Sequence, residues 1–312
     1  MKNLYGYLSL FLCLVLLLCP LISAKNGDSS VVAATPSDIP YEDRVFRVKL
    51  TDSGQIKNIS EKEYIIGVVA AEMPALYSEE ALKAQAVAAY TFALYKKESN
   101  KKEDFDLTDS YVTDQAFITN EKMQEKWGEN YQTYLDKITL AVESVYGKTV
   151  KYDGKYALTV YTAYSAGKTE SAKTVWGKDI AYLTPVESVG DLLCPDLIST
   201  ETFTTDDIKG KLPSIANVDA SLWFSSPTLS ESGTVTSMTF GEISLSGQEI
   251  RTALNLKSAN FEVKKDGDNF TFTVKGYGHL IGMSQYGANY MALQGSKYDE
   301  ILLWYYKGCT VS

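Results

Sequence analysis

The first candidate for chemistry is a glutamate at the predicted end of a helix. Residues 64–90 read YIIGVVAAEMPALYSEEALKAQAVAAY, and Glu72 stands directly before Met73 and Pro74. A proline disfavours helical geometry in the residue before it, so the helix is expected to end at about Met73. The carbonyl groups of a last turn repel negative charge and apolar neighbours remove water, and both effects raise a carboxyl pKa.

A carboxyl group in this position can act as a general acid. If it stays protonated near neutral pH, it can protonate a glycosidic oxygen as the glycosidic bond breaks. The alternative interpretation is a surface glutamate paired with a lysine such as Lys83. The residues alone leave both interpretations open.

A second group of candidates lies in the glycine-rich stretch GYGHLIGMSQYGANYMALQG, residues 276–295. Glycines around His279 and Ser284 let the backbone approach a ligand closely. Ser284 can cap the helix that follows, which would leave free N–H donors at its start for a sugar hydroxyl or acetamide. The G-x-S-x-G pattern of a hydrolase is absent. The alternative is a glycine-rich turn with a structural histidine.

The composition of the chain limits the classes of substrate and cofactor that it could bind. The net charge of -9 and the pI near 4.9 disfavour a nucleic-acid partner and favour a neutral or weakly charged one. The single histidine excludes a His-rich catalytic metal site. The 22 tyrosines suit carbohydrate binding, although core packing is the commoner role of any one of them. Cys194 and Cys309 either form a bridge or are unpaired core residues.

The N-terminus predicts export or membrane attachment. Residues 4–24 carry no charge and are long enough for either a retained anchor or a cleaved signal. Residues 25–43 are polar and aperiodic, which is typical of a linker. We therefore expect residues 1–24 to be a signal or membrane anchor and residues 44–312 to be an extracytoplasmic domain, either anchored in the cell membrane or secreted.

The patterns downstream predict an α+β fold, with a helical segment packed against antiparallel β hairpins. Ser60 and Ser78 are the predicted caps of the first two helices. Residues 185–230 are predicted to be irregular. The other expected elements are a strand over 45–50, helices near 120–127, 129–146, 284–294 and 297–306, and hairpins at Asp153-Gly154 and Asp266-Gly267.

Four motifs in this chain together resemble the SpoIID/LytB family. They cover residues 60–308 in the family's order, and the last is the most specific. The four are EYIIGVVAAEMPALYSEEALKAQAVAAYTFALYK, SAGKTESAKTVWG, LSGQEIRTALNLKSANFEV and GYGHLIGMSQYGANYMALQGSKYDEILLWYYKG. The resemblance implies a SpoIID-like catalytic core over 44–312, with motif blocks at 60–177 and 233–308.

The resemblance also implies an activity. Members of this family are lytic transglycosylases that cut peptidoglycan between N-acetylmuramic acid (MurNAc) and N-acetylglucosamine (GlcNAc), on strands stripped of stem peptides, during engulfment in sporulation. The glutamate of the family's Glu-Met-Pro motif is the catalytic acid, and it falls here on Glu72. One carboxyl group then suffices, because it next takes the proton of the muramoyl C6 hydroxyl and a 1,6-anhydro end forms without water.

The expected site combines the two candidate regions. Glu72 is the catalytic residue, and no metal and no cofactor are expected, because the histidine and cysteine ligands of zinc-binding clostridial relatives are lacking. The expected substrate-binding residues are Lys83, Gln85, Tyr90, Ser165, His279, Ser284, Gln285 and Tyr286.

Departures from the family pattern keep a second function open. Tyr90 stands where relatives usually have an arginine, and Thr162 stands where they often have a histidine. These changes favour a non-catalytic peptidoglycan-binding activator of a cell-wall amidase, as in the LytB branch, whereas Glu72 favours the enzyme. The partners implied by the resemblance are glycan strands, the stage II sporulation proteins P and M, and the membrane through the N-terminal segment, with no nucleic acid.

Overall fold

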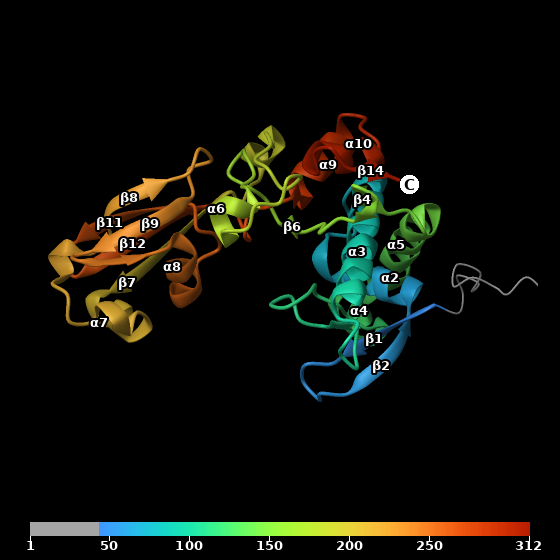
Figure 1. The fold of residues 1–312 in the computed structure, drawn as a ribbon, viewed down its shortest axis with the longest axis horizontal. Helices are drawn as coiled ribbons and strands as arrows, with labels where there is room; N and C mark the ends of the chain where they lie inside the picture. The colour runs from blue at the N-terminus through green and yellow to red at the C-terminus, as the bar shows by residue number, and fades with distance from the viewer. Residues whose placement is uncertain (1–43) are drawn as a thin grey trace, which may run out of the picture. The chain divides into compact units, whose positions relative to one another are not determined.

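The computed structural model describes residues 44–312, and the predicted signal or anchor and the linker lie outside the described residues. The described chain is α+β, as predicted, with several small, mostly antiparallel sheets (Figure 1). No helix within residues 44–312 combines the length and the apolar character that a membrane crossing requires.

Helix α3 is the centre of the helical part. It contacts α2, α5, α9 and α10 (Figure 1). Alanines at positions 81, 84, 86, 88, 89 and 93 are buried, and their small side chains let the neighbouring helices come close. The helices of this part are α2 (Glu61–Glu72), α3 (Glu79–Ser99), α4 (Asn120–Trp127), α5 (Tyr131–Val145), α9 (Gln285–Leu293) and α10 (Tyr298–Tyr305).

The ends of α2 follow from its sequence. The Ser60 side chain accepts a hydrogen bond from the Glu63 N–H at 3.2 Å, which confirms the predicted cap. At the other end Met73 is extended, with φ of -123° and ψ of 138°, because Pro74 follows it. Ser78 occupies the predicted cap position of α3 but makes no side-chain cap bond; its N–H donates instead to Asn289 Oδ1 of α9 at 2.7 Å.

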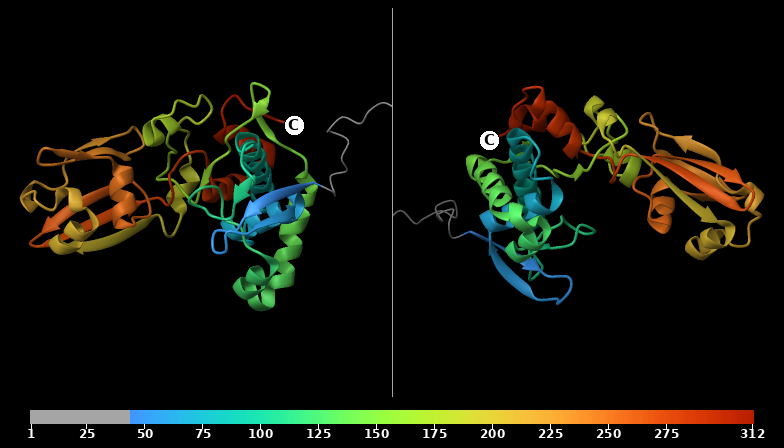
Figure 2. Two further views of the ribbon diagram at one scale, coloured as in Figure 1. Left: turned by 60° about the horizontal axis from the view of Figure 1, so that its bottom comes forward. Right: turned by 180° about the vertical axis from the view of Figure 1, so that it is seen from behind.

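Short strands surround these helices. The sheet β2-β1-β3 combines β1 (Val45–Lys49) with antiparallel β2 (Ile56–Ser60) and parallel β3 (Leu107–Thr108). The sheet β14-β4-β5 combines β14 (Thr310–Val311), β4 (Val150–Tyr152) and β5 (Lys155–Tyr156). The predicted turn at Asp153-Gly154 joins β4 to β5, with positive φ at both residues. Strand β6 (Tyr161–Thr162) pairs in parallel with β13 (Met283–Ser284), which links two distant motifs. Both views of Figure 2 show the red C-terminal helices, α9 and α10, beside the cyan α3.

A second set of strands forms its own hydrophobic core. One sheet has the order β11-β12-β7, and another has the order β10-β9-β8. The elements are β7 (Ile198–Thr204), α7 (Thr205–Lys211), β8 (Ser225–Leu229), β9 (Val235–Phe240), β10 (Ile243–Leu245), α8 (Gly247–Leu254), β11 (Phe261–Asp266) and β12 (Asn269–Lys275). The irregular structure predicted for 185–230 is therefore wrong over β7, α7 and β8. Strand β7 pairs with β12 along its whole length. The remaining elements are α6 (Ala172–Trp176) and the short helices η3 (Gly128–Asn130), η4 (Val189–Leu193), η5 (Pro213–Ile215) and η6 (Ala220–Leu222).

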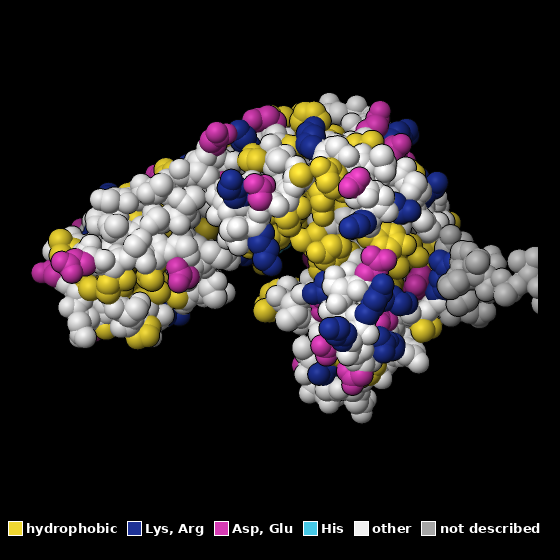
Figure 3. All heavy atoms as spheres, in the orientation of Figure 1, with side chains coloured by type: hydrophobic (Ala, Val, Ile, Leu, Met, Phe, Trp, Pro, Cys, Tyr) yellow, Lys and Arg dark blue, Asp and Glu magenta, His cyan; other side chains and the backbone are white. Residues whose placement is uncertain are grey.

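The two cores are distinct clusters of buried apolar side chains. The first is built around α2, α3 and α5, and the second lies among β9, β12, α7 and α8. Cys194 and Cys309 are both buried and unpaired, so the possible bridge does not form. Hydrophobic side chains also reach the surface, and Figure 3 shows them gathered over the region of α3, β6 and α9. Leu76 at 74% and Tyr111 at 79% are among the most exposed of the large hydrophobic residues.

Candidate functional site

Glu72 is the last residue of α2 and is partly buried. Its Oε1 accepts a hydrogen bond from the Ala116 N–H at 2.8 Å. Burial raises the pKa of the Glu72 carboxyl, and this effect outweighs the hydrogen bonds from Ala116 and Gln285 and the charge of Lys126, which lower it. Among the interactions described here, Glu72 forms no pair with Lys83, which instead bonds Glu79 and Glu80 on its own helix.

Lys126 supplies the cation that the last turn of α2 lacks. Its Nζ donates to the carbonyl oxygens of Ala70 at 2.9 Å and Ala71 at 3.4 Å. A lysine at these carbonyls satisfies groups that a helix end leaves unpaired and offsets its partial negative charge. The electrostatic penalty expected at this helix end is thus reduced, and burial is the main reason that the pKa of Glu72 is raised.

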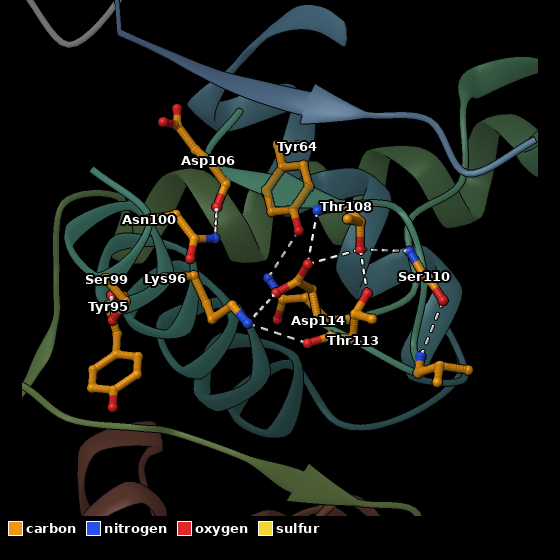
Figure 4. Close-up of polar contacts among 12 residues, drawn as sticks. Tyr64, Tyr95, Lys96, Ser99, Asn100, Asp106, Thr108, Ser110, Thr113 and Asp114 are labelled. Carbon is orange, nitrogen blue, oxygen red and sulfur yellow. Dashed lines mark hydrogen bonds and ion pairs between the residues drawn. The ribbon is translucent and has the colours of Figure 1, made fainter. Parts of the chain in front are cut away.

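The loop that presents the Ala116 N–H is held by a buried carboxylate. Asp114 Oδ2 accepts hydrogen bonds from the N–H and hydroxyl of Thr108 at 2.8 and 2.7 Å (Figure 4). Asp114 Oδ1 pairs with Lys96 Nζ of α3 at 2.7 Å, and Lys96 also donates to the carbonyl of Thr113. The loop is therefore fixed to α3 two residues before the donor that reaches Glu72.

Neutral polar side chains lie near Glu72. Gln285 of α9 donates to Gln85 Oε1 of α3 at 3.4 Å, and both side chains are buried. The Tyr161 hydroxyl donates to Gln115 Oε1 at 2.8 Å, and Gln115 donates to the Tyr64 hydroxyl at 3.3 Å. Burial raises the pKa of both tyrosines, so they stay neutral. Glu72 is thus the group beside these neutral side chains whose carboxyl, with its raised pKa, can give and take a proton.

The glycine-rich segment serves the protein's own packing. Ser284 caps α9 as predicted, accepting a hydrogen bond from the Gly287 N–H at 3.0 Å. The N–H of Tyr286 is already bonded to the carbonyl of Ala163, so the donors expected to be free for a ligand are partly occupied. Gly278 and Gly282 have positive φ, and a side chain at either would collide with Thr162 or Val160. These glycines let the segment lie against the β6 strand.

The remaining predicted residues lie in separate surroundings. His279 accepts a hydrogen bond from the Ile281 N–H and packs edge-on against Trp176, and burial lowers its pKa to about 4, so its ring is neutral. Ser165 is buried and donates to Asp191. The Tyr286 hydroxyl donates to the carbonyl of Leu193 at 3.1 Å.

Tyr90 lies at the far end of α2 from the acid. Its buried hydroxyl donates to Glu61 Oε2 at 2.7 Å. Glu61 is the first residue of α2 and Glu72 the last, which places them about 16 Å apart along the helix axis. The structure therefore assembles Glu72, Gln85 and Gln285 and leaves Tyr90 outside this group. Thr162 donates to the carbonyl of Tyr277 at 2.7 Å and holds the glycine-rich segment.

Comparison with known proteins places the chain in a family. A family model described as Stage II sporulation protein (SpoIID) matches residues 50–152. The chain is 38% identical to Stage II sporulation protein D of Bacillus subtilis (strain 168), over 93% of this chain and 82% of that protein. It is 36% identical to Stage II sporulation protein D of Bacillus amyloliquefaciens, over 93% of this chain and 83% of that protein. The chain belongs to the SpoIID family.

A more distant relative carries a different name. The SpoIID chain described here is 29% identical to the Amidase enhancer of Bacillus subtilis (strain 168), over 79% of this chain and 40% of that protein. The family assignment agrees with the resemblance seen in the four motifs. The matches to the two Stage II sporulation proteins D each cover 93% of this chain, which is enough to include both Glu72 and Gln285.

Several groups at the site were not predicted. Ala116, Lys126, Gln115 and Asp191 come from segments without a recognised motif, and each reaches the site through a contact between distant parts of the chain. For a lysine in a short amphipathic helix, such as Lys126, the sequence does not indicate which helix end the side chain will contact. Within residues 44–312, no cluster of three or more His, Cys, Asp or Glu side chains could hold a metal ion.

Proposed function

We propose that this SpoIID-family chain is a lytic transglycosylase that cleaves MurNAc–GlcNAc bonds of peptidoglycan strands stripped of stem peptides, during engulfment in sporulation. The observation that carries the proposal is the environment of Glu72. Its carboxyl is partly buried, its pKa is raised, and one of its oxygens is fixed by the Ala116 N–H. These are the properties of a general acid that works near neutral pH.

The reaction needs only this one carboxyl group. Protonated Glu72 gives its proton to the glycosidic oxygen as the bond from muramoyl C1 to that oxygen breaks. The resulting carboxylate then takes the proton of the C6 hydroxyl, and the C6 oxygen bonds to C1. The products are a free GlcNAc hydroxyl and a 1,6-anhydro-MurNAc end, and Glu72 is again protonated. No water is consumed, unlike the hydrolysis carried out by paired carboxylates.

The surroundings of Glu72 suit an uncharged sugar. The amide groups of Gln285 and Gln85 and the phenol group of Tyr161 lie near it. Such groups hydrogen-bond hydroxyls and acetamides without favouring an anion. The hydrophobic side chains gathered over α3, β6 and α9 in Figure 3 and the net charge of -9 also disfavour a strongly anionic substrate.

Digestion of stem-peptide-free glycan by the full chain tests the proposal. We expect mass spectrometry to find new 1,6-anhydro-MurNAc ends, and we expect them to disappear with Glu72→Gln. The matched control is Glu63→Gln, which changes an exposed glutamate of the same helix and should leave the product yield unchanged. Equal product from the wild type and Glu72→Gln would show that Glu72 is not the acid.

The second candidate is a non-catalytic activator of a cell-wall amidase. It is favoured by the relative named Amidase enhancer. In the same experiment, glycan binding without new ends in both the wild type and Glu72→Gln would support this function instead. For either function we propose stage II sporulation proteins P and M as partners, and an extracytoplasmic location at the cell membrane, with secretion as the alternative.

A further inference from the structure

Asp191 is a buried carboxylate that belongs to none of the sequence motifs. It lies in η4 and has no measurable exposure. Its Oδ2 accepts hydrogen bonds from the Ser165 N–H at 2.8 Å and from the Ser165 hydroxyl at 2.6 Å. Its Oδ1 accepts one from the Ser284 hydroxyl at 2.7 Å. A buried carboxylate with this many donors is well satisfied and fixes the groups that donate to it.

The bond to Ser284 leads directly to the proposed acid. Ser284 is the cap of α9 and the end of β13, so its position sets where α9 begins. The next residue is Gln285. Its side-chain amide donates to Gln85 Oε1 and also forms a hydrogen bond to the Glu72 carboxyl. We infer that Asp191 is a positioning residue, which holds Ser284 so that the first turn of α9 places the Gln285 amide on Glu72. This inference rests on the proposed function of Glu72.

The close packing of η4 against α9 fixes the position of the Asp191 side chain. A side-chain carbon added to Gly287 would lie 3.2 Å from Asp191 Oδ1 and would collide with Tyr305 and Ser188. A carbon added to Gly190 would collide with the Tyr290 ring. Two glycines, one on each element, thus permit the close approach that brings the carboxylate to Ser284. The Ser188 and Tyr305 hydroxyls bond each other at 2.8 Å and close the other side.

Replacing Asp191 by asparagine disturbs this arrangement with little change of shape. A carboxylate only accepts hydrogen bonds, whereas an amide offers one accepting oxygen and one donating nitrogen. The Ser165 N–H must be accepted, so the amide nitrogen would face Ser284 Oγ. That oxygen already accepts the Gly287 N–H, and its own proton would lose its acceptor. The start of α9 would then shift, and the Gln285 amide would leave Glu72.

The test is the titration of the Glu72 carboxyl in the full chain. Glutamate labelled with carbon-13 at the carboxyl reports each pKa by NMR, and Glu72→Gln identifies the signal. We expect Asp191→Asn to raise the pKa of Glu72 by about half a unit or more, the size of one lost hydrogen bond. The other titratable groups that face Glu72 are Lys126, Tyr64 and Tyr161, and Asp191→Asn alters none of them.

Two further variants separate positioning from general stability. Ser165→Ala removes a hydroxyl from the other Asp191 oxygen, so it should lower the melting temperature but leave the pKa of Glu72 unchanged. Gln285→Ala should raise that pKa as Asp191→Asn does, and the double variant should raise it no further. If Asp191→Asn lowers stability without moving the Glu72 titration, or if its shift adds to that of Gln285→Ala, the inference is wrong.

The titration is independent of the proposed activity. Where the wild type forms anhydro ends, Asp191→Asn should also move the alkaline limb of the pH–rate profile to higher pH, because Glu72 keeps its proton longer. A wild type that forms no such ends overturns the proposed function, while the NMR result still decides whether Asp191 positions Gln285.

Discussion

Replacing Gly67 by alanine sets two effects of opposite sign against each other in the helix that carries Glu72. Gly67 lies inside α2, where alanine is favoured over glycine by about 1 kcal/mol. The added carbon would, however, lie 2.6 Å from Phe117 Cδ2 and 2.7 Å from the carbonyl oxygen of Ile118. Ordinary carbon contacts are 3.5 to 4.0 Å, so the loop must move by about 1 Å.

The clash outweighs the helix preference. Overpacking of this kind costs about 1 to 3 kcal/mol. The Phe117 ring cannot turn freely, since it stacks on Tyr64 with the ring centres 5.4 Å apart, and the Ile118 carbonyl is backbone. The cost of the clash should therefore lie in the upper part of that range, about 2 to 3 kcal/mol. Subtracting the helix preference of about 1 kcal/mol leaves a net loss of about 1 to 2 kcal/mol in unfolding free energy. The melting temperature should fall by about 2 to 4 °C for each kcal/mol.

The displaced loop also carries the donor to Glu72. Ala116 directly precedes Phe117, so moving the loop lengthens the 2.8 Å bond to Glu72 Oε1. Loss of that bond raises the pKa of Glu72, and the alkaline limb of the proposed activity should move to higher pH. Differential scanning calorimetry and a pH–rate profile measure the two effects.

Gly210→Ala is the matched control for this prediction. Gly210 is also helical, in α7, and nothing lies within 4 Å of the position an added carbon would take. This variant should be as stable as the wild type or more so, with an unchanged pH profile. If Gly67→Ala stabilised the chain as Gly210→Ala does, the tight contact between α2 and the loop would be refuted.

Three further predictions follow from the charges and hydroxyls near α2. Burial raises the pKa of Glu72 in the folded chain above its value in the unfolded chain, so wild-type stability should fall as pH rises from the unfolded pKa to the folded pKa. In urea unfolding at pH 8, Glu72→Gln should be more stable than the wild type by about 1.4 kcal/mol for each unit by which the pKa is raised. At pH 3.5 the two proteins should be equally stable, because neither carries a charge at position 72. Lys96→Met should cost about 2 to 3 kcal/mol in the same measurement, because Asp114 has only 3% side-chain exposure and would lose its cation; no loss would mean that the pair contributes nothing. Tyr90→Phe should cost about 1 to 2 kcal/mol by removing the donor to Glu61, yet leave the turnover rate within twofold, and a large loss of rate would place Tyr90 in the site after all.

The parts of the fold that could be predicted are those with local causes. Ser60 and Pro74 define α2 because a cap and a proline act on neighbouring residues. The Asp153-Gly154 turn needs positive φ at both positions, which these two residues tolerate. Strand β7 was missed because its sequence ISTETFT is mostly polar and mostly exposed, so alternation of buried side chains does not mark it. Its cause is the pairing with β12, which is not local.

The site shows the same division between local and distant causes. The position of Glu72 at a helix end could be predicted from the Glu-Met-Pro motif, because the proline ends the helix. Its neighbours are not: the Ala116 N–H comes from 44 residues away, and the Lys126 amine reaches the end of α2 from 56 residues away along the chain. His279 was a candidate because it lies in the glycine-rich segment, but its ring is a neutral packing group beside Trp176.

The chemical state of Glu72 therefore depends on the docking of distant segments. Gln285 meets Gln85 across 200 residues, and Ser78, at the start of α3, bonds Asn289 of α9 across 211. Burial is the main cause of the raised pKa, and the carboxyl is contacted by Gln285 of α9 and by the Ala116 N–H of the loop before α4. A chain in which α9 is undocked would lose the contact of Gln285 with Glu72 and expose the carboxyl more to water, so its pKa should move back toward the ordinary value of a glutamate. The acid is consequently formed by tertiary packing, and any contact that fixes α9, including that of Asp191 with Ser284, bears on the proposed reaction.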